Sequence, residues 1–286
     1  MNFLLKSTLI SKIFPFPSPT ALMISYPRSG SSWIGDVINT SPGIAFLREP
    51  ISQSFSSTYN VVSIFEVSNN NDYKSSYERI THKAFNGMLP KNFKDVKNIN
   101  DFSLDSRKKK KLFIKEVNYM GIDLYKQYNP QLIILLRNPA AIADSYRRMN
   151  WIGDDYDYED FAYNYGNQMN AIIEKTRQLD TKVVLYEDIA LHPFIQFIRL
   201  FMFLNVNVPN NFSKIIKKYC NNYDIFTNPY ETKRVSFQQV NKWKKNLSFE
   251  RILQLKKGLL RSNLQYYRCD KYWDLIDHRS HQKYTL

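Results

Sequence analysis

Residues 25–34 read Ser-Tyr-Pro-Arg-Ser-Gly-Ser-Ser-Trp-Ile. A short apolar run, residues 21–24, precedes them, and apolar residues at helical spacing follow. The sequence therefore predicts a buried strand, a turn that contains Gly30, and a helix. Amide groups and the positive dipole end at the start of a helix attract anions, and Arg28 adds a fixed positive charge. We expect this turn to hold a phosphate or a sulfate group.

The turn is not a Walker loop, which requires Gly-x-x-x-x-Gly-Lys-Ser/Thr. It resembles the first motif of the sulfotransferase family, close to Tyr-Pro-Lys-Ser-Gly-Thr-Thr-Trp, with an arginine in place of the lysine and two serines in place of the threonines. Its Arg-Ser-Gly-Ser-Ser core is most similar to the carbohydrate and tyrosylprotein branches. In that family the motif binds the 5′-phosphosulfate of 3′-phosphoadenosine-5′-phosphosulfate (PAPS). The resemblance implies that the following residues bind this co-substrate: Arg28, Ser29, Gly30, Ser31, Ser32 and Trp33.

A second apolar run, residues 131–136, predicts a strand that is buried on both faces. Asn138 can cap a following helix, and Pro139 suits the first turn of that helix. Arg137 is therefore expected at the carboxyl end of the strand, where open α/β sheets bind ligands. The block from Arg137 to Ser145 resembles the family's second motif, Arg-Asp/Asn-Pro followed by a serine. In that family the arginine and the serine hold the 3′-phosphate, which implies these roles for Arg137 and Ser145.

A candidate for the catalytic base follows a short predicted strand, residues 44–47. Transfer of a sulfuryl group to an alcohol needs a group that accepts the hydroxyl proton. The stretch from Arg28 to Pro50 resembles the carbohydrate 6-O-sulfotransferases, in which a similar run ends in Glu-Pro at the same spacing. The resemblance implies Glu49 as the base. The alternative is a surface glutamate that pairs with Arg48.

The strand predicted at residues 112–117 carries two further candidates. Small-molecule sulfotransferases use a histidine shortly after Lys-Thr, but Val117 stands at that position, so histidine catalysis is not expected. A basic residue recurs nearby in several branches, which implies that Lys115 lines the active site; the alternative is a lysine that ends a strand. Glu116 is the second candidate for the base.

Residues 234–236 and 240–245 resemble a C-terminal loop that closes over PAPS in related enzymes. The resemblance implies that Arg234 or Ser236 reaches the 3′-phosphate and that Trp243 packs under the loop. A solvated, basic helix start is the alternative.

Two elements between these motifs are expected to serve packing. Residues 182–186 predict a strand that leads into a Tyr-Glu-Asp-Ile block, a recurrent feature of sulfotransferases. A helix that begins at Pro193 is expected to have one thick apolar face. Inserted loops at residues 52–71 and 154–160 are expected to contact the acceptor.

The composition favours an acidic partner. The 286 residues include 40 Lys and Arg against 26 Asp and Glu, which gives a net charge of +14. Such a charge suits a nucleotide with several phosphates, an anionic glycan, nucleic acid or a membrane surface. No aromatic-basic pattern of a nucleic-acid module appears, so nucleic acid is not expected as a partner. The basic run at residues 107–111 is expected to be a solvated loop; contact with acidic lipid or polysaccharide is the alternative.

These observations predict an α/β, P-loop-like three-layer fold with a central parallel sheet flanked by helices, the sulfotransferase fold. We expect a single domain over residues 1–286, with a core at 21–245 and extensions at 1–20 and 246–286 that pack on it. The resemblance implies transfer of the sulfuryl group from PAPS to a hydroxyl group, most readily of a carbohydrate or glycolipid, with release of 3′,5′-ADP (PAP).

No His/Cys cluster or carboxylate-rich loop suggests a metal, and none is expected. The two cysteines and the absence of a clear anchor predict a cytoplasmic protein, with peripheral membrane contact as a further expectation. Two other functions remain open: a P-loop nucleotide kinase, and a non-catalytic polyanion-binding protein.

Overall fold

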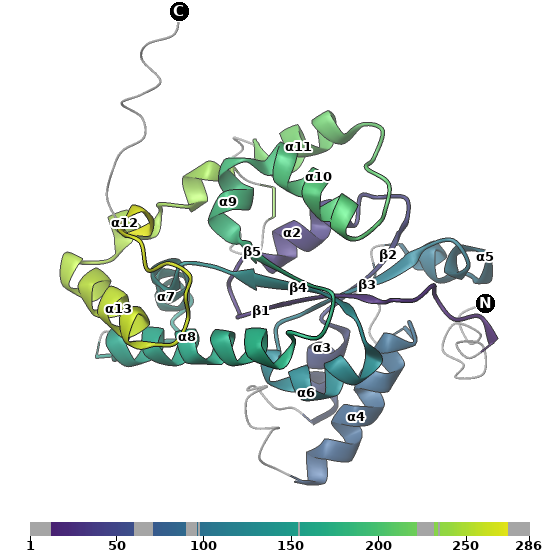
Figure 1. The fold of residues 1–286 in the computed structure, drawn as a ribbon, viewed down its shortest axis with the longest axis horizontal. Helices are drawn as coiled ribbons and strands as arrows, with labels where there is room; N and C mark the ends of the chain where they lie inside the picture. Colours follow the sequence, from purple (N-terminus) through teal and green to yellow (C-terminus); the bar gives the residue numbers. More distant parts are fainter. Residues whose placement is uncertain are drawn as a thin grey trace, which may run out of the picture. The chain divides into compact units, whose positions relative to one another are not determined.

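The computed structural model describes residues 13–59, 71–89, 96, 98–153, 155–221, 232–233 and 235–273 (Figure 1). The chain forms two compact units. The first comprises Met1–Arg137 and Ile172–Gln239, and the second comprises Asn138–Ala171 and Val240–Leu286. Among the described residues, the first unit holds the sheet, and the regular structure of the second is helical.

A parallel sheet of five strands, in the order β2-β3-β1-β4-β5, forms the centre of the first unit. The strands are β1 (Ala21–Ser25), β2 (Ile44–Arg48), β3 (Lys111–Glu116), β4 (Gln131–Leu136) and β5 (Thr181–Leu185). Every residue of β1 and β4 is buried, as continuous apolar runs predict for central strands. Ile24 of β1 pairs with Glu116 on one side and with Ile134 on the other. The carboxyl ends of the three central strands therefore lie in one row.

Helices cover both faces of this sheet (Figure 1). On one face lie α2 (Ser31–Ile38), α10 (Pro193–Phe203) and α11 (Phe212–Cys220), and α9 (Tyr186–Leu191) follows β5 directly. On the other face lie α3 (Pro50–Tyr59), α4 (Asn71–Phe85) and α6 (Ile122–Tyr125). Short helical turns complete the unit: η4 (Ile99–Phe102), α5 (Leu104–Arg107), η5 (Tyr119–Gly121), η6 (Lys126–Tyr128) and η7 (Phe237–Gln239).

The second unit contains α7 (Pro139–Arg148), α12 (Trp243–Asn246), α13 (Phe249–Arg261), η8 (Asp270–Tyr272) and most of α8 (Tyr158–Lys175). The start of α7 is as predicted: the side chain of Asn138 accepts a hydrogen bond from the amide of Ala140 at 2.8 Å, and Pro139 lies in the first turn. The ammonium group of Lys257 pairs with the carboxylate of Glu159 at 2.8 Å, which joins α13 to α8.

The predicted strands and the α/β class are confirmed, but the basic run at residues 107–111 is a solvated turn only in part: Lys108 and Lys109 are exposed, whereas Arg107 is not. Arg107 is completely buried, and its guanidinium donates hydrogen bonds to the backbone carbonyls of Phe102, Asn86 and Gly87. Burial lowers the pKa of Arg107 to about 10. Lys111 begins β3. The carbonyls that satisfy this guanidinium come largely from a distant part of the chain, so the local sequence does not reveal its burial.

The helix that begins at Pro193 also differs from its prediction, because it is apolar on two sides. Phe197 and Phe201 are buried, whereas Phe194, Ile195 and Met202 are exposed.

The loop expected at residues 52–71 is partly helical. Residues 52–59 belong to α3 and Asn71 begins α4, whereas residues 60–70 lie outside the described part of the chain. At the other expected loop, Tyr158 already begins α8. Apolar positions at helical spacing outweigh the Ser and Asn content that suggested a loop.

Candidate active site

The turn between β1 and α2 is shaped for an anion. Gly30 precedes α2 in the left-handed conformation, with φ of 88°, and the amide of Ser29 donates to the carbonyl of Tyr26 at 3.2 Å. No side chain caps the start of α2, and its first turn has no acidic residue. A helix start of this kind presents amide donors and a positive dipole end to an external anion.

Two hydroxyl groups of the turn support the same conclusion. The Oγ atom of Ser29 is buried and has no hydrogen-bond partner among the described residues. The hydroxyl of Ser31 accepts a hydrogen bond from Ser25 at 2.9 Å, which leaves its own proton to donate. An unsatisfied buried hydroxyl costs about 1–3 kcal/mol, and a phosphate or sulfate oxygen would remove that cost. The donor set therefore suits a phosphate or sulfate group.

The side chain of Tyr186, the first residue of α9, packs against the turn at Gly30. Its ring lies so close to Gly30 that a Cβ atom built there would meet the ring atom Cδ2 at 2.6 Å. Any larger residue at position 30 would push the ring away, in addition to the cost of a positive φ. Trp33 packs edge-on against the same ring, with 5.6 Å between the centroids, and its indole N–H donates to the carbonyl of Tyr219 at 3.0 Å. Trp33 thus contributes to the turn through packing.

Arg137 lies beside this turn. Its Nη1 atom donates to the carbonyl of Arg28 at 2.9 Å, and its guanidinium carbon lies 4.1 Å from the centroid of the Tyr186 ring. Nη2 contacts the carbonyl of Gln239 at 3.4 Å. The structure therefore brings Arg137, at the end of β4, next to the backbone of Arg28 in the turn that follows the neighbouring strand β1, and the Tyr186 ring contacts Arg137.

Glu49 and Lys115 form an ion pair at the end of β2 and β3. Glu49 has a positive φ of 49°, and its amide donates to the carbonyl of Lys115 at 2.6 Å. The side chain of Lys115 is 1% exposed, whereas that of Glu49 is 23% exposed. Arg48 pairs instead with Asp36 on α2, so the suggested Arg48–Glu49 surface pair is wrong. Glu49 is held in place by a buried cation and stays accessible from solvent.

Glu116, the other candidate for the base, is completely buried. Its carboxylate accepts hydrogen bonds from the amides of Ile51 at 2.7 Å and Ser52 at 3.3 Å, and from the hydroxyl of Ser52. Burial raises the pKa of Glu116 to about 7. This carboxylate anchors the first turn of α3, the helix that begins directly after Glu49. Of the two carboxylates, only that of Glu49 is open to solvent.

The remaining candidate residues are placed as follows. Ser145 is buried on α7 in the second unit. Ser236 is buried in the first unit, where its amide donates to Cys220 and its hydroxyl donates to Ala190, each at 2.7 Å. Arg234 lies outside the described residues. Trp243 belongs to the second unit, and its indole N–H donates to Val240 at 2.8 Å. Roles for Ser145, Ser236 and Arg234 at a phosphate stay predictions.

The sequence did not predict that Tyr186 contacts Arg137 and the Gly30 turn, or that Glu116 binds the first amides of α3. Tyr186 directly follows a strand, as Arg137 does, and this position alone could have indicated that it lies near the site.

Among the described residues, no group of three His, Cys, Asp or Glu side chains is arranged to hold a metal. In the same part of the chain, no helix combines the length and apolar character needed to span a membrane.

Comparison with known proteins identifies the class. The sulfotransferase domain family matches residues 18–262, most of the chain, so the chain belongs to the sulfotransferase family. The structure is similar to that of the mouse sulfotransferase SULT7A1 complexed with PAP, with a TM-score of 0.52 and 16% sequence identity over 94% of this chain and 95% of that one. It is also similar to the sulfotransferase domain of the Synechococcus PCC 7002 olefin synthase, with a TM-score of 0.49 and 17% identity over 85% and 94% of the two chains. No curated protein matched the sequence.

Proposed function

We propose that this sulfotransferase moves the sulfuryl group from PAPS to a hydroxyl group of a carbohydrate or glycolipid and releases PAP. The observation that carries the proposal is the hydrogen bond from Arg137 to the carbonyl of Arg28, because it puts the guanidinium of Arg137 next to a helix start that no side chain caps. One such cation beside one such turn suits a nucleotide with phosphate groups at two positions. PAPS has that arrangement.

In this proposal the two ends of PAPS are held by different groups. The amides and hydroxyls of the Gly30 turn, with Arg28, would bind the 5′-phosphosulfate. Arg137 would bind the 3′-phosphate, and Ser145, Arg234 and Ser236 are the further candidates there. The ring of Tyr186 would keep Arg137 beside the turn, because it contacts the guanidinium of Arg137 and lies against Gly30.

Group transfer would follow from the position of Glu49. As the acceptor oxygen bonds to sulfur, the bond between sulfur and the 5′-phosphate oxygen breaks, and the acceptor proton passes to the Glu49 carboxylate. The acceptor hydroxyl becomes acidic only as its bond to sulfur forms, so an ion-paired carboxylate suffices as the base. Lys115 would orient Glu49, and Arg28 would offset the charge that develops on the leaving phosphate. This scheme needs no metal.

The proposal of a carbohydrate or glycolipid as the acceptor is based on the resemblance of residues 28–50 to the carbohydrate 6-O-sulfotransferases. Two features of this stretch bear on it: the arginine in the phosphate turn and the Glu-Pro pair that follows β2. A cytoplasmic location stays a prediction from the sequence.

The proposal is tested by combining a transfer assay with a thermal shift. With radiolabelled PAPS and a panel of glycans and glycolipids, we expect label in an acceptor and one PAP released per sulfate transferred. PAP at a hundredfold excess over its dissociation constant should raise the free energy of unfolding by about 2.7 kcal/mol. ATP with magnesium should not.

Variants separate the alternatives. Arg137→Ala should strongly reduce the shift with PAP at the same concentration, and Arg177→Ala, which removes an exposed guanidinium paired with Glu174, should leave it unchanged. A shift with ATP and magnesium alone would indicate a nucleotide kinase. A shift with PAP that saturates without any sulfate transfer would indicate a binding protein.

A further inference from the structure

The outer side of α10 is apolar, although a surface helix normally turns polar residues to solvent. Four large side chains on α9 and α10 are exposed, namely Leu191, Phe194, Ile195 and Met202, with Met202 at 72%. We call these four residues the α10 face. Leu191 ends α9, Phe194 and Ile195 are adjacent in the first turn of α10, and Met202 follows Ile195 by seven residues, or about two turns, so the three α10 residues share one side of the helix. The core-facing side of α10 is formed by Phe197, Leu200 and Phe201, which are buried within the first unit. The core therefore does not explain the α10 face.

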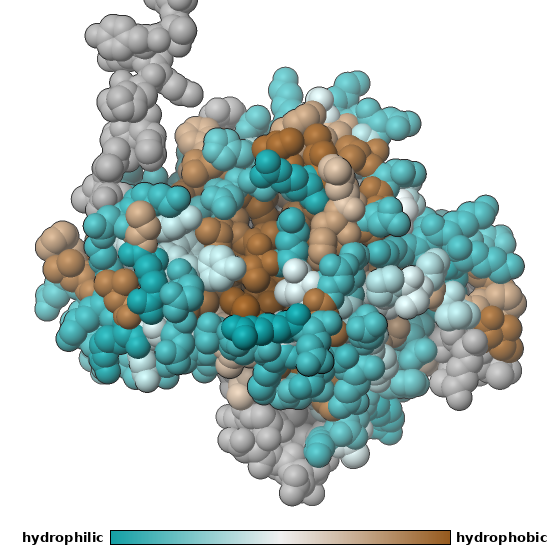
Figure 2. All heavy atoms as spheres, viewed as in Figure 1, coloured by the Kyte–Doolittle hydropathy of each residue, from teal (hydrophilic) through white to brown (hydrophobic). Residues whose placement is uncertain are grey.

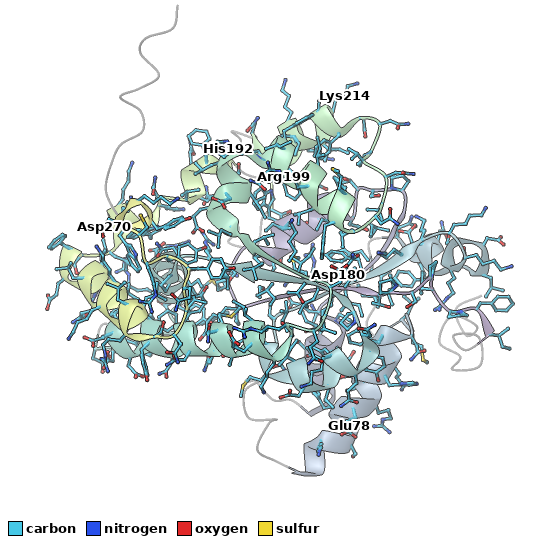
Figure 3. All side chains as sticks on the ribbon, viewed as in Figure 1. Glu78, Asp180, His192, Arg199, Lys214 and Asp270 are labelled. Carbon is cyan, nitrogen blue, oxygen red and sulfur yellow. The ribbon has the colours of Figure 1, made fainter. Side chains whose placement is uncertain are left out.

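Basic residues border the α10 face. Arg199 is exposed on α10 itself, and Lys214, Lys217 and Lys218 are exposed on α11. Ring contacts join the two helices: the ring centroid of Phe212 on α11 lies 5.2 Å from that of Phe194 and 5.5 Å from that of Phe201. Neither α10 nor α11 contains an acidic residue. In Figure 2 apolar side chains gather over these two helices with hydrophilic ones beside them, and Figure 3 labels Arg199 and Lys214 there.

We propose that the α10 face, with its basic border, docks on an anionic lipid surface. Exposed Phe, Ile, Leu and Met side chains can enter the boundary between headgroups and acyl chains, while Lys and Arg contact lipid phosphates. This combination suits a bilayer better than a second copy of the chain, because the lysines and the net charge of +14 repel an identical surface. The inference goes beyond the sulfuryl transfer proposed above and does not depend on it.

The test is co-sedimentation of the full chain with vesicles. We expect binding to vesicles of phosphatidylcholine with 30% phosphatidylglycerol, weak binding to pure phosphatidylcholine, and weaker binding to the anionic vesicles in 0.5 M NaCl, because salt screens surface charges. The double variant Phe194→Glu, Met202→Glu should lower the partition coefficient at least tenfold. Phe249→Glu is the matched control, because Phe249 is 70% exposed on a different helix, α13, and should have no such effect.

The basic border is tested separately. Replacing Lys214, Lys217 and Lys218 by glutamine should lower the partition coefficient by about fivefold per residue on anionic vesicles, since each basic residue near such a surface strengthens binding by about that factor. The same replacements should have little effect on phosphatidylcholine. Circular dichroism and the melting temperature establish that each variant is folded.

Two outcomes would overturn the proposal. One is equal sedimentation of the wild type with and without anionic lipid. The other is a dimer in analytical ultracentrifugation that the Phe194→Glu, Met202→Glu variant dissociates, because the α10 face would then serve as a protein interface.

Discussion

Glu49 and Glu116 lie close together in the fold but differ in exposure, and this difference assigns them separate roles. Glu49 is partly open and paired with Lys115, whereas Glu116 is enclosed and bonded to the first amides of α3. Glu49, the proposed base, directly precedes α3, and the hydrogen bonds from the first turn of α3 to Glu116 fix the start of that helix.

Replacement of Glu49 by glutamine should lower kcat by about 10²- to 10⁴-fold, because the amide cannot accept the acceptor proton. The PAP-induced thermal shift should remain, since Glu49 is not among the residues proposed to hold the nucleotide. Steady-state rates with the best acceptor measure the effect. Glu174→Gln, on the surface, is the control. Unchanged turnover in Glu49→Gln would exclude this residue as the base.

Glu116 should give the stability of the protein a recognisable pH dependence. Burial raises its pKa from the usual 4.5 to about 7, so the folded state holds a proton that the unfolded state releases. The corresponding stabilisation is complete below pH 4.5 and is lost as pH rises to about 7, at up to about 1.4 kcal/mol per pH unit. Urea unfolding of wild type and Glu116→Gln at pH 5 and pH 7.5 measures it. The wild type should lose stability relative to the variant over this range; parallel pH curves would refute the assignment.

At the scale of the elements, the turn between β1 and α2 depends on the start of α9. Gly30→Ala should lower the free energy of unfolding by about 2 kcal/mol or more, because the left-handed conformation costs about 1–2 kcal/mol and the new methyl group displaces Tyr186. It should also weaken PAP binding. Denaturant unfolding and the PAP thermal shift are the measurements. Gly43→Ala is a matched control, since the nearest atom to its added Cβ lies at an ordinary 3.6 Å. Equal losses in both variants would argue against a special role for the Gly30 turn.

The sequence was sufficient to predict the elements that carry the site. The two central strands β1 and β4 are largely apolar runs, so their burial on both faces could be read directly, and Arg28, Glu49 and Arg137 follow strand ends, where parallel sheets bind ligands. The support given by Tyr186 and Glu116 could not be predicted, because it depends on segments that meet only in the folded chain.

The same limit applies to charged and apolar residues whose environment is set by distant segments. Arg107 is buried because backbone carbonyls from several segments surround it, and Met202 is exposed although it belongs to an apolar helix. From residue type alone, Arg107 would be expected at the surface and Met202 in the core. Local pattern therefore identified the strands and their ends but not which side of α10 faces solvent.

At the scale of the whole molecule, the net charge of +14 should assist the capture of an anionic nucleotide. We expect KM for PAPS to rise about tenfold between 50 mM and 0.5 M NaCl, with little change in kcat, because salt screens long-range attraction more than contacts inside the site. Initial rates over a PAPS series at each salt concentration provide the measurement. A salt-independent KM would show that the overall charge serves another purpose.

The central claim is that the Gly30 turn and Arg137 hold the two phosphorylated ends of one adenosine nucleotide. Titration calorimetry with PAP and with 5′-AMP, which lacks the 3′-phosphate, tests it most directly. The wild type and the surface variant Arg177→Ala should bind PAP about ten- to hundredfold more tightly than 5′-AMP, as charge-assisted hydrogen bonds to one phosphate imply. Arg137→Ala should bind the two nucleotides alike. Equal affinities in the wild type, or a preference for PAP that survives in Arg137→Ala, would contradict the claim.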